Sequence, residues 1–384
     1  MLAKTFFGME QLLADELRQL GATQVSEGNR LVRFCGDKGF MYKANLCLRT
    51  ALKILKPIFE FRAENEVALY EKLYQFDWAD ILSPDQTFAI DSVVNGNIFK
   101  HSLYTTQRCK DAIVDRMRKD HGKRPTVDTL HPDIRLHLHI FDKKCSLSLD
   151  TSGKSLHHRG YRSLTNIAPI NEVLAAGIVL MTGWDQKTDF MDPMCGSGTF
   201  LIEAAMMASK IPANINRNEF AFEKWSDWDE NLFEKIKSSQ LKRVIAPMGK
   251  IYGFDKAPSA IEKSIVNIKN TNLEEFISVN RANFFNSQKM GDTPLHLLTN
   301  PPYGERLDGE INELYQKFGD TLKRSYPNTQ AWMISSNFEA LKFVGLRPSR
   351  KIKLYNGKLE TRLCFFPIYE GTKKIHKLKN QNDT

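Results

Sequence analysis

The sequence predicts an α/β protein with two small α+β units, followed by a doubly wound domain that has a mostly parallel sheet and a C-terminal antiparallel hairpin. Up to about residue 155, short helix and strand patterns follow one another in mixed order. From about residue 160, strand patterns alternate regularly with helix patterns, which is typical of a parallel sheet with helices on both faces. Near the end, KIKLYNGKLETRLCFF holds two strand patterns about an Asn-Gly pair, the strongest short hairpin signal.

The first α+β unit is expected to occupy residues 1–62. GMEQLLADELRQLGA has apolar residues at helical spacing and ends near a glycine, and NRLVRFCG after it alternates like a strand. GFMYKANLCLRTALKIL, residues 39–55, predicts a second helix, and KPIFEFRA predicts an extended segment that closes the unit.

The second α+β unit is expected at residues 63–155. QTFAIDSVV predicts a strand, and TTQRCKDAIVDRMRKDHG predicts a basic amphipathic helix. DIRLHLHIF and KCSLSLD predict two further strands, joined by a Lys-Lys turn.

The third domain is expected at residues 156–370. Residues 371–384 are polar and basic, and we expect them to form a disordered tail. Within the domain, FEKWSDWDENLFEKIK predicts a helical insertion near the mouth of the site, to which we assign no role. The alternating strands and helices are TDFMD, GTFLIEAAMMASK, GKIYGFD, APSAIEKSIVNIKNT, ISVNRANF and PLHLLTN.

The composition favours a polyanionic partner, because 54 Lys and Arg residues against 45 Asp and Glu residues give a net charge of +9. No apolar run approaches membrane-spanning length, and MLAKTFFGMEQLLADEL lacks a signal-peptide pattern, so we expect a cytoplasmic protein. The six cysteines form no C-x-x-C pair, which argues against zinc, an iron-sulfur cluster or a disulfide framework. We therefore expect no metal.

A glycine-containing turn follows the first strand of the third domain. Asp192 ends this strand, where open α/β sheets bind ligands, and Gly196 and Gly198 let the backbone approach a ligand closely. The dinucleotide fingerprint fails because Leu201 occupies its third glycine position. Asp192 would repel a pyrophosphate and favours a ligand that is cationic at one end, such as S-adenosylmethionine. The alternative is a purely structural strand-to-helix turn.

Two further strand ends add polar residues at the same edge. Asp255 ends GKIYGFD, where it can accept hydrogen bonds from both ribose hydroxyls of a nucleoside, or cap the helix that follows. Asn283 follows the next strand, and Phe284 can either flank an adenine ring or pack in the core. Together, Asp192, Asp255 and Asn283 form a more specific pattern than any one of them.

The fourth strand runs into NPPYGER, a motif that suits a planar amine. The exocyclic amine of a base is a poor nucleophile because its lone pair is delocalised into the ring. The side-chain oxygen of Asn300 and the carbonyl of Pro301 can hold the amine in a more tetrahedral form, aimed at an electrophilic methyl group. Pro301 and Pro302 make these acceptors rigid, and Tyr303 offers a face to an extruded base. A structural turn is the alternative.

Basic and aromatic residues indicate a nucleic-acid surface in the second unit and at its junction with the third domain. This mixture suits phosphate contact and base stacking. For any one of these residues, a solvated helix face is the simpler interpretation. The candidates are Lys110, Arg116, Arg118, Lys119, Lys123 and Arg124 in the second unit, and His158, Arg159, Tyr161 and Arg162 at the junction.

DPMCGSGTFLIEAA together with NPPYGER resembles the class I S-adenosylmethionine-dependent methyltransferases that modify exocyclic amines. KDAIVDRMRKDHGKRPTVDTLHPDIRLHLHIF, with LSLDTSGKSLHHRGYR after it, resembles the THUMP-containing family that methylates guanine in RNA, in particular its bacterial branch acting on 23S ribosomal RNA. The resemblance covers about residues 1–370. It implies a ferredoxin-like N-terminal domain, a THUMP RNA-binding domain and a Rossmann-like methyltransferase domain.

The resemblance also implies roles for single residues. The family's ribose carboxylate falls on Asp255 and its target-amine motif on Asn300 to Tyr303. The family commonly has an acidic residue where this chain has Asn283, which can donate as well as accept hydrogen bonds. The family's cofactor loop falls on Asp192, Pro193, Cys195, Gly196, Ser197, Gly198 and Thr199.

We therefore expect an RNA methyltransferase that flips a guanine out of its stack and methylates the N2 amine, with S-adenosylmethionine as cofactor and 23S ribosomal RNA as the favoured partner. Transfer RNA is the alternative substrate. The alternative functions are a DNA adenine methyltransferase and a noncatalytic RNA-binding or ribosome-assembly protein.

Overall fold

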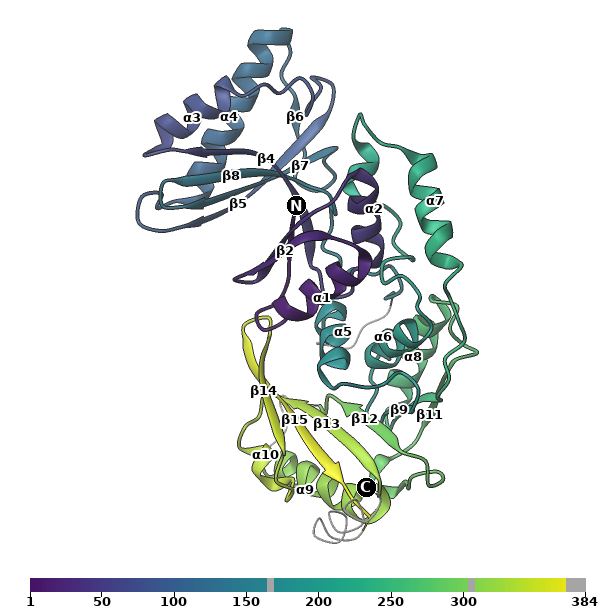
Figure 1. Ribbon diagram of the computed structural model, residues 1–384. Coiled ribbons are helices and arrows are strands. Elements are labelled where there is room, and N and C mark those ends of the chain that lie inside the picture. The colour runs from purple at the N-terminus through teal and green to yellow at the C-terminus, as the bar shows by residue number, and fades with distance from the viewer. Residues whose placement is uncertain (164–168, 303–307, 371–384) are drawn as a thin grey trace. The chain divides into compact units, whose positions relative to one another are not determined.

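The computed structural model describes residues 1–163, 169–302 and 308–370; the expected disordered tail and Tyr303 lie outside them. The chain divides into two compact units (Figure 1). The N-terminal unit contains residues 1–5, 13–156 and 218–238, and the C-terminal unit contains 6–12, 157–217 and the residues from 239 onward.

A single sheet runs through the N-terminal unit. Among the described residues it has eight strands, in the order β2-β3-β1-β4-β8-β7-β5-β6. β4 pairs with β1 on one side and with β8 on the other, so this strand joins the first expected α+β unit to the second. The strands are β1 (Leu2–Lys4), β2 (Thr23–Gly28), β3 (Leu31–Cys35), β4 (Lys53–Arg62), β5 (Thr87–Asn95), β6 (Thr126–Val127), β7 (Ile134–Phe141) and β8 (Lys144–Asp150).

One expected helix ends earlier than predicted. The helix predicted for residues 39–55 stops at Cys47, and β4 begins at Lys53. The carboxylate of Glu16 accepts hydrogen bonds from the amides of Arg49 (3.0 Å) and Thr50 (2.9 Å), which holds this segment in a non-helical conformation. The first four helices are α1 (Glu10–Leu20), α2 (Lys38–Cys47), α3 (Glu66–Gln75) and α4 (Ser102–His121).

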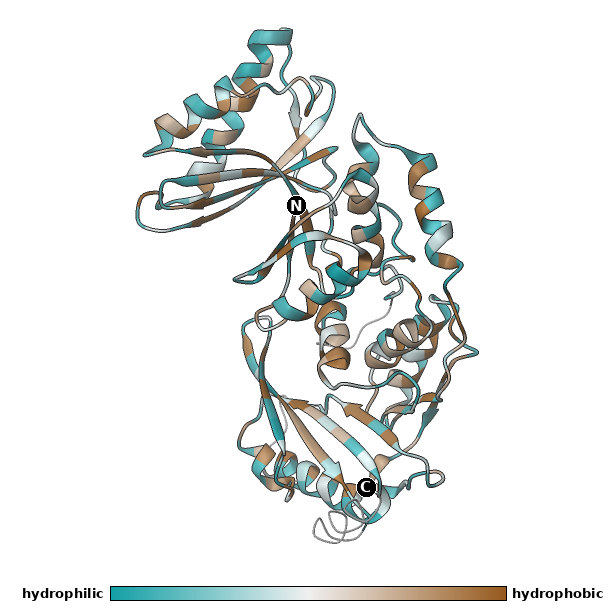
Figure 2. Ribbon diagram, viewed as in Figure 1, coloured by the Kyte–Doolittle hydropathy of each residue, from teal (hydrophilic) through white to brown (hydrophobic). Residues whose placement is uncertain are grey.

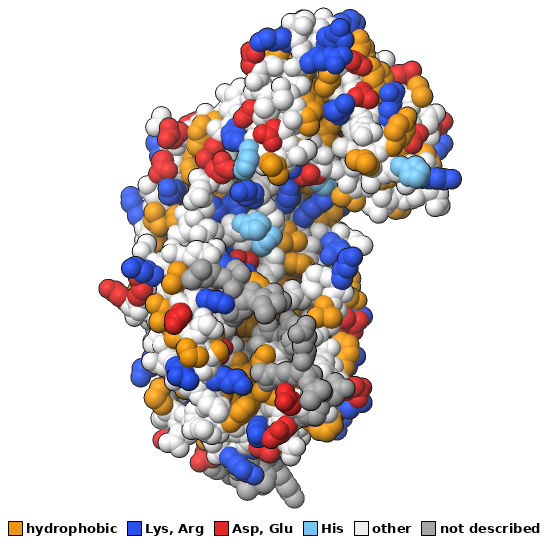
Figure 3. Space-filling model, turned by 180° about the vertical axis from the view of Figure 1, so that it is seen from behind, with side chains coloured by type: hydrophobic (Ala, Val, Ile, Leu, Met, Phe, Trp, Pro, Cys, Tyr) orange, Lys and Arg blue, Asp and Glu red, His pale blue; other side chains and the backbone are white. Residues whose placement is uncertain are grey.

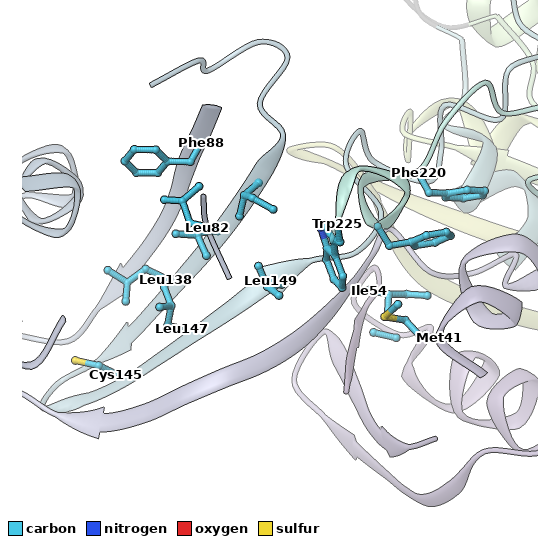
Figure 4. Packing of buried hydrophobic residues seen from close by; sticks show 14 of the residues in the cluster. Met41, Ile54, Leu82, Phe88, Leu138, Cys145, Leu147, Leu149, Phe220 and Trp225 are labelled. Carbon is cyan, nitrogen blue, oxygen red and sulfur yellow. The ribbon is translucent and has the colours of Figure 1, made fainter. Parts of the chain in front are cut away.

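The insertion that we expected near the mouth of the site instead completes the core of the N-terminal unit, through residues 218–238. The ring of Phe222 lies 4.6 Å from that of Tyr42 on α2. Figure 4 shows Phe220 and Trp225 in the same cluster as side chains of β4 and β8. Aromatic residues far along the chain thus supply part of this core. The insertion contains η1 (Ala221–Lys224) and most of α7 (Glu230–Leu241).

The C-terminal unit is the expected doubly wound fold. Within the described chain its sheet has seven strands in the order β11-β10-β9-β12-β13-β15-β14; the first five are parallel, and β15 and β14 form the antiparallel hairpin predicted about Asn356 and Gly357. The strands are β9 (Asp189–Asp192), β10 (Ile251–Asp255), β11 (Ile277–Arg281), β12 (Leu295–Thr299), β13 (Thr329–Ser335), β14 (Arg350–Asn356) and β15 (Leu359–Ile368).

Helices cover both faces of this sheet. One hydrophobic cluster joins α5, α6 and α8 to the sheet, and another joins α9 and α10 to its opposite face (Figure 1). α6 is buried along its whole length, whereas α4 of the N-terminal unit is hydrophilic over much of its length (Figure 2). No described helix is both long and apolar enough to cross a membrane. The remaining helices are α5 (Glu172–Met181), α6 (Thr199–Ala208), α8 (Pro258–Lys269), η2 (Phe284–Asn286), α9 (Asp308–Ser325) and α10 (Ala340–Phe343).

Replacing Phe222 with alanine should destabilise the N-terminal unit by about 3–5 kcal/mol, because it leaves a void in a buried aromatic cluster. Hydrogen exchange read by mass spectrometry should show lost protection in α2. Lys235→Ala, at an exposed position of the same insertion, is the control. Unchanged protection of α2 in Phe222→Ala would show that the insertion does not support this core.

Candidate functional site

The carboxyl ends of the parallel strands bring the predicted polar residues to one edge of the sheet. Gly253 of β10 lies opposite Asp192 of β9, and Leu297 of β12 lies opposite Met191. Asp255 follows Gly253 at the end of β10, and Asn300 follows Leu297 just beyond the end of β12. The two carboxylates and the Asn300 amide therefore belong to one cluster, as the strand alternation predicted.

Asp192 is a buried carboxylate, with 2% of its surface exposed. Its Oδ1 accepts hydrogen bonds from the amide of Met194 (3.1 Å) and the hydroxyl of Thr299 (3.0 Å). No Lys, Arg or His of the described chain forms an ion pair with it. Burial raises the pKa of Asp192 to about 7, and the nearby charge of Asp255 adds to the rise. The site thus has a buried negative charge that a cationic ligand would neutralise.

The carboxylate of Asp255 holds the glycine loop in place. Its Oδ2 accepts a hydrogen bond from the amide of Gly196 (3.1 Å), and its Oδ1 accepts one from the amide of Ala257 (2.9 Å) at the start of α8. Ala257 is the N-cap residue of α8 and makes no side-chain cap, and Asp255 bonds to its amide and not to an amide of the first helical turn, so the predicted capping role is wrong. Each carboxylate oxygen has a second lone pair, so these bonds leave capacity for ribose hydroxyls.

α8 supports the loop from its other side. The hydroxyl of Ser264 donates to the carbonyl of Gly196 (2.8 Å), and the amide of Asn267 donates to the carbonyl of Ser197 (3.1 Å). Gly198 has a left-handed backbone, with φ of 81°, where the chain turns into α6. The remaining loop residues Pro193, Cys195 and Thr199 are buried, and burial raises the pKa of the Cys195 thiol. That thiol is consequently protonated and serves as packing.

The side-chain oxygen of Asn300 is an acceptor with no partner among the described residues. This Oδ1 atom is buried and accepts no hydrogen bond from any described residue. Pro301 is buried and Pro302 is exposed, while Tyr303 lies outside the described residues. A buried acceptor left without a donor costs roughly 1–3 kcal/mol, so a ligand donor here would recover that free energy.

Asn283 and Phe284 differ in their exposure. Asn283 is exposed, and its side-chain oxygen accepts a hydrogen bond from the amide of Phe285 (3.1 Å). Phe284 is buried, and its ring packs against those of Phe318 (5.3 Å) and Tyr326 (5.1 Å). The expected adenine contact of Phe284 is therefore wrong, because its ring belongs to the core. Phe285, the next residue along the chain, is partly exposed.

At the expected junction surface, Arg159 and Tyr161 are inside the C-terminal unit. Arg159 pairs with Glu203 of α6 (3.4 Å), and the Tyr161 hydroxyl donates to the same carboxylate (3.0 Å). Both residues have 1% of their surface exposed, so the predicted RNA contact is wrong for them. The missed signal was Glu203 itself, because a carboxylate in an otherwise apolar helix needs a buried cationic partner.

Arg162 is also largely buried, and it contacts the first residue of α6, directly after the glycine loop. One of its terminal nitrogens donates to the hydroxyl of Thr199 (2.8 Å) and to the carbonyl of Ile170 (2.9 Å). Its Nε forms an ion pair with the carboxylate of Glu172 (3.2 Å). Among the four junction candidates, His158 alone is exposed.

The basic residues of the second unit lie on α4 and just after it. Figure 3 shows Lys and Arg side chains, with acidic ones among them, over the end of the N-terminal unit where α3 and α4 lie. Lys110 pairs with Asp111, Arg116 with Asp120 and Lys123 with Asp85. Arg118, Lys119 and Arg124 are exposed, and none of them pairs with a described carboxylate. Three of the six basic candidates in this unit thus form ion pairs, and the charges of the other three are not paired with a described carboxylate.

Three domain-family models match the chain. They are the RlmL ferredoxin-like domain at residues 1–55, the THUMP domain at residues 63–150, and the RMKL-like methyltransferase domain at residues 159–364. The last match covers more than half of the chain.

Curated relatives and solved structures resemble the chain over nearly its full length. The "Ribosomal RNA large subunit methyltransferase K/L" of Syntrophotalea carbinolica is 37% identical over 94% of this chain and 53% of its own length. "Putative RNA methyltransferase slr0064" of Synechocystis sp. is 34% identical over 94% of this chain and 95% of its own length. The crystal structure of SMU.472 complexed with SAH has a TM-score of 0.85 and 28% identity, covering 97% and 98% of the two chains. The chain spans about half the length of the K/L relatives that it matches.

Proposed function

This chain belongs to the RMKL-like methyltransferase-domain family, and on that premise we propose that it methylates RNA at the N2 amine of a guanine. S-adenosylmethionine is the cofactor. The favoured substrate is 23S ribosomal RNA, and the site of action is the cytoplasm. The names of the K/L relatives and the THUMP match support an RNA of the large ribosomal subunit.

The observation that carries the proposal is the unpartnered Oδ1 of Asn300 at the edge of the sheet. An exocyclic amine is a donor that this buried acceptor lacks. With the rigid carbonyl of Pro301, it would hold the amine so that its lone pair points toward the methyl group. A guanine must leave its stack to reach this position, as in other enzymes that act on a base.

The residues around Asp192 fit S-adenosylmethionine. The buried Asp192 carboxylate forms no ion pair with a described residue and so suits a cationic ligand, and Asp255 and the loop from Pro193 to Thr199 would hold its nucleoside and amino-acid parts. Asn283 would contribute one polar contact to the base. Bound there, S-adenosylmethionine supplies a methyl group that is already activated by the charge on its sulfur. The protein's own task is then to position the amine and to exclude water.

The test is transfer of radiolabelled methyl from S-adenosylmethionine to separate pools of ribosomal RNA, transfer RNA and DNA from cells that lack this gene. We expect label in N2-methylguanosine of large-subunit RNA. The same product from transfer RNA would change the substrate only, whereas label in methyladenine of DNA would contradict the proposal. No label in any pool, with intact cofactor binding, would favour a noncatalytic RNA-binding or assembly protein.

Replacing Asn300 with alanine should lower turnover at least about a hundredfold, because one preorganised acceptor at the reacting atom is lost. Binding of S-adenosylmethionine should be almost unchanged, since Asn300 faces the substrate. Asn286→Ala, an exposed asparagine in η2, is the control. Loss of cofactor affinity in Asn300→Ala would contradict the clamp.

The affinity for S-adenosylmethionine should depend on the ionisation of Asp192. Because the pKa of Asp192 is raised to about 7, its attractive charge is present above pH 7 and is lost below it. Between pH 7.5 and pH 6 the affinity should therefore fall by up to about tenfold. Isothermal titration calorimetry at each pH measures the affinity for S-adenosylmethionine. Asp192→Asn should bind weakly and with no such pH dependence, whereas Asp320→Asn, at a surface carboxylate, should behave like the wild type.

Replacing Arg118, Lys119 and Arg124 together with glutamine should weaken RNA binding and lower its salt dependence. Each phosphate contact that is lost makes the negative slope of log K against log salt concentration less steep by about 0.7 on single-stranded RNA. The slope of the triple variant should therefore be less steep by about 2. The matched control is the triple change of Lys110, Arg116 and Lys123, which already pair with carboxylates. If both triple variants lost RNA affinity and salt dependence equally, the RNA-binding surface would lie elsewhere.

A further inference from the structure

A cation stacked on an aromatic ring lies at the carboxyl edge of the C-terminal sheet, among residues that have no role so far. The guanidinium of Arg362 on β15 is 4.1 Å from the centroid of the Phe338 ring. Phe338 is in the turn that follows β13. The amide of Asn337 in this turn donates to the hydroxyl of Ser335 (3.0 Å). The amide of Ala340 donates to the side chain of Asn337 (2.9 Å), so the turn that carries Phe338 is held by its own hydrogen bonds.

The strand register places this pair close to the proposed amine clamp. Thr299 of β12 lies opposite Met333, and two residues further along β13, Ser335 lies opposite Arg362. By this register, Arg362 lies two residues beyond the level of Thr299, on the side where Asn300 and Pro301 follow β12. β13 lies between β12 and β15, so the backbones of these two strands are about 10 Å apart, which is two strand spacings.

Arg362 carries a charge that no described carboxylate neutralises. Lys353, directly opposite it on β14, has a partner in Glu360 at 2.6 Å. Arg362 and Phe338 are both partly exposed. A guanidinium that stacks on a ring keeps its charge, its other face and its hydrogen-bond donors. These are the features that bind a phosphate and stack on an unpaired base in RNA.

We propose that Phe338 and Arg362 bind the RNA nucleotide next to the target guanine. Arg362 contacts the phosphate, and the stacked pair supports the base of that nucleotide. The inference rests on the proposed methylation of RNA at this edge, and it names a second contact for the same substrate. Holding the neighbouring nucleotide would keep the flipped guanine within reach of Asn300.

The test compares Arg362→Ala, Arg362→Lys and Phe338→Leu in the full chain, with an RNA fragment that the wild type methylates. We expect KM for RNA to rise about tenfold in Arg362→Ala and Phe338→Leu, the size of one lost stack or charge contact. Arg362→Lys keeps the charge but not the flat face, so its KM should be intermediate. Affinity for S-adenosylmethionine should stay unchanged. Arg350→Ala, an exposed arginine at the far end of the same hairpin, should keep the wild-type KM.

An unchanged KM for RNA in Arg362→Ala would overturn the inference. An equal rise in Arg350→Ala would also overturn it, because the effect would then be general attraction of RNA. A lower melting temperature and lost cofactor affinity would show that Arg362→Ala fails to fold. In that case the KM for RNA of Arg362→Lys and Phe338→Leu, compared with the wild type, tests the inference. If the wild type does not methylate RNA, the proposed function fails and this inference fails with it; loss of the KM effect alone leaves the function standing.

Discussion

The hydrogen bond from the Thr299 hydroxyl to the Asp192 carboxylate connects the two halves of the site. It joins the ends of β9 and β12, and it satisfies one oxygen of a carboxylate that the fold has removed from water. Thr299 directly precedes Asn300, so the same bond fixes the backbone from which the proposed clamp projects. This hydrogen bond thus links the residues proposed to hold the cofactor with those proposed to hold the substrate, and the raised pKa of Asp192 is a consequence of its burial.

The apolar helix α6 has a similar connecting role. It starts at the glycine loop, and its Glu203 forms an ion pair with Arg159 and accepts a hydrogen bond from Tyr161, both in the segment that precedes α5. Arg162 in that segment bonds to Thr199 at the first turn of α6. A buried ion pair contributes little net stability compared with apolar packing, but breaking it leaves an unpaired charge. These residues therefore fix the position of the loop, which explains why basic side chains at this place are not on the surface.

The order of strands and helices in the C-terminal unit could be predicted from the sequence because periodicity and turn residues are local signals. The Asn356-Gly357 hairpin and the polar strand ends at Asp192 and Asp255 follow from them. The errors arose where a partner distant in sequence decides the outcome. Glu16 ends the helix before Arg49, and the Phe318 and Tyr326 rings draw Phe284 into the core. The insertion could not be placed for the same reason, because Tyr42 is nearly 200 residues away from it. The pairing of Arg362 with Phe338 left no pattern in the sequence.

In the function proposed above, Asn300 and Pro301 hold the exocyclic amine of a flipped guanine. The most direct measurement is a crystal structure of the protein with a non-transferable analogue of S-adenosylmethionine and a guanine-containing RNA fragment. We expect the N2 amine within hydrogen-bond distance of the Asn300 Oδ1 and the Pro301 carbonyl, with the cofactor's charged groups near Asp192. A guanine bound with its amine away from Asn300, or an Asn300 Oδ1 bonded instead to another part of the protein, would contradict it.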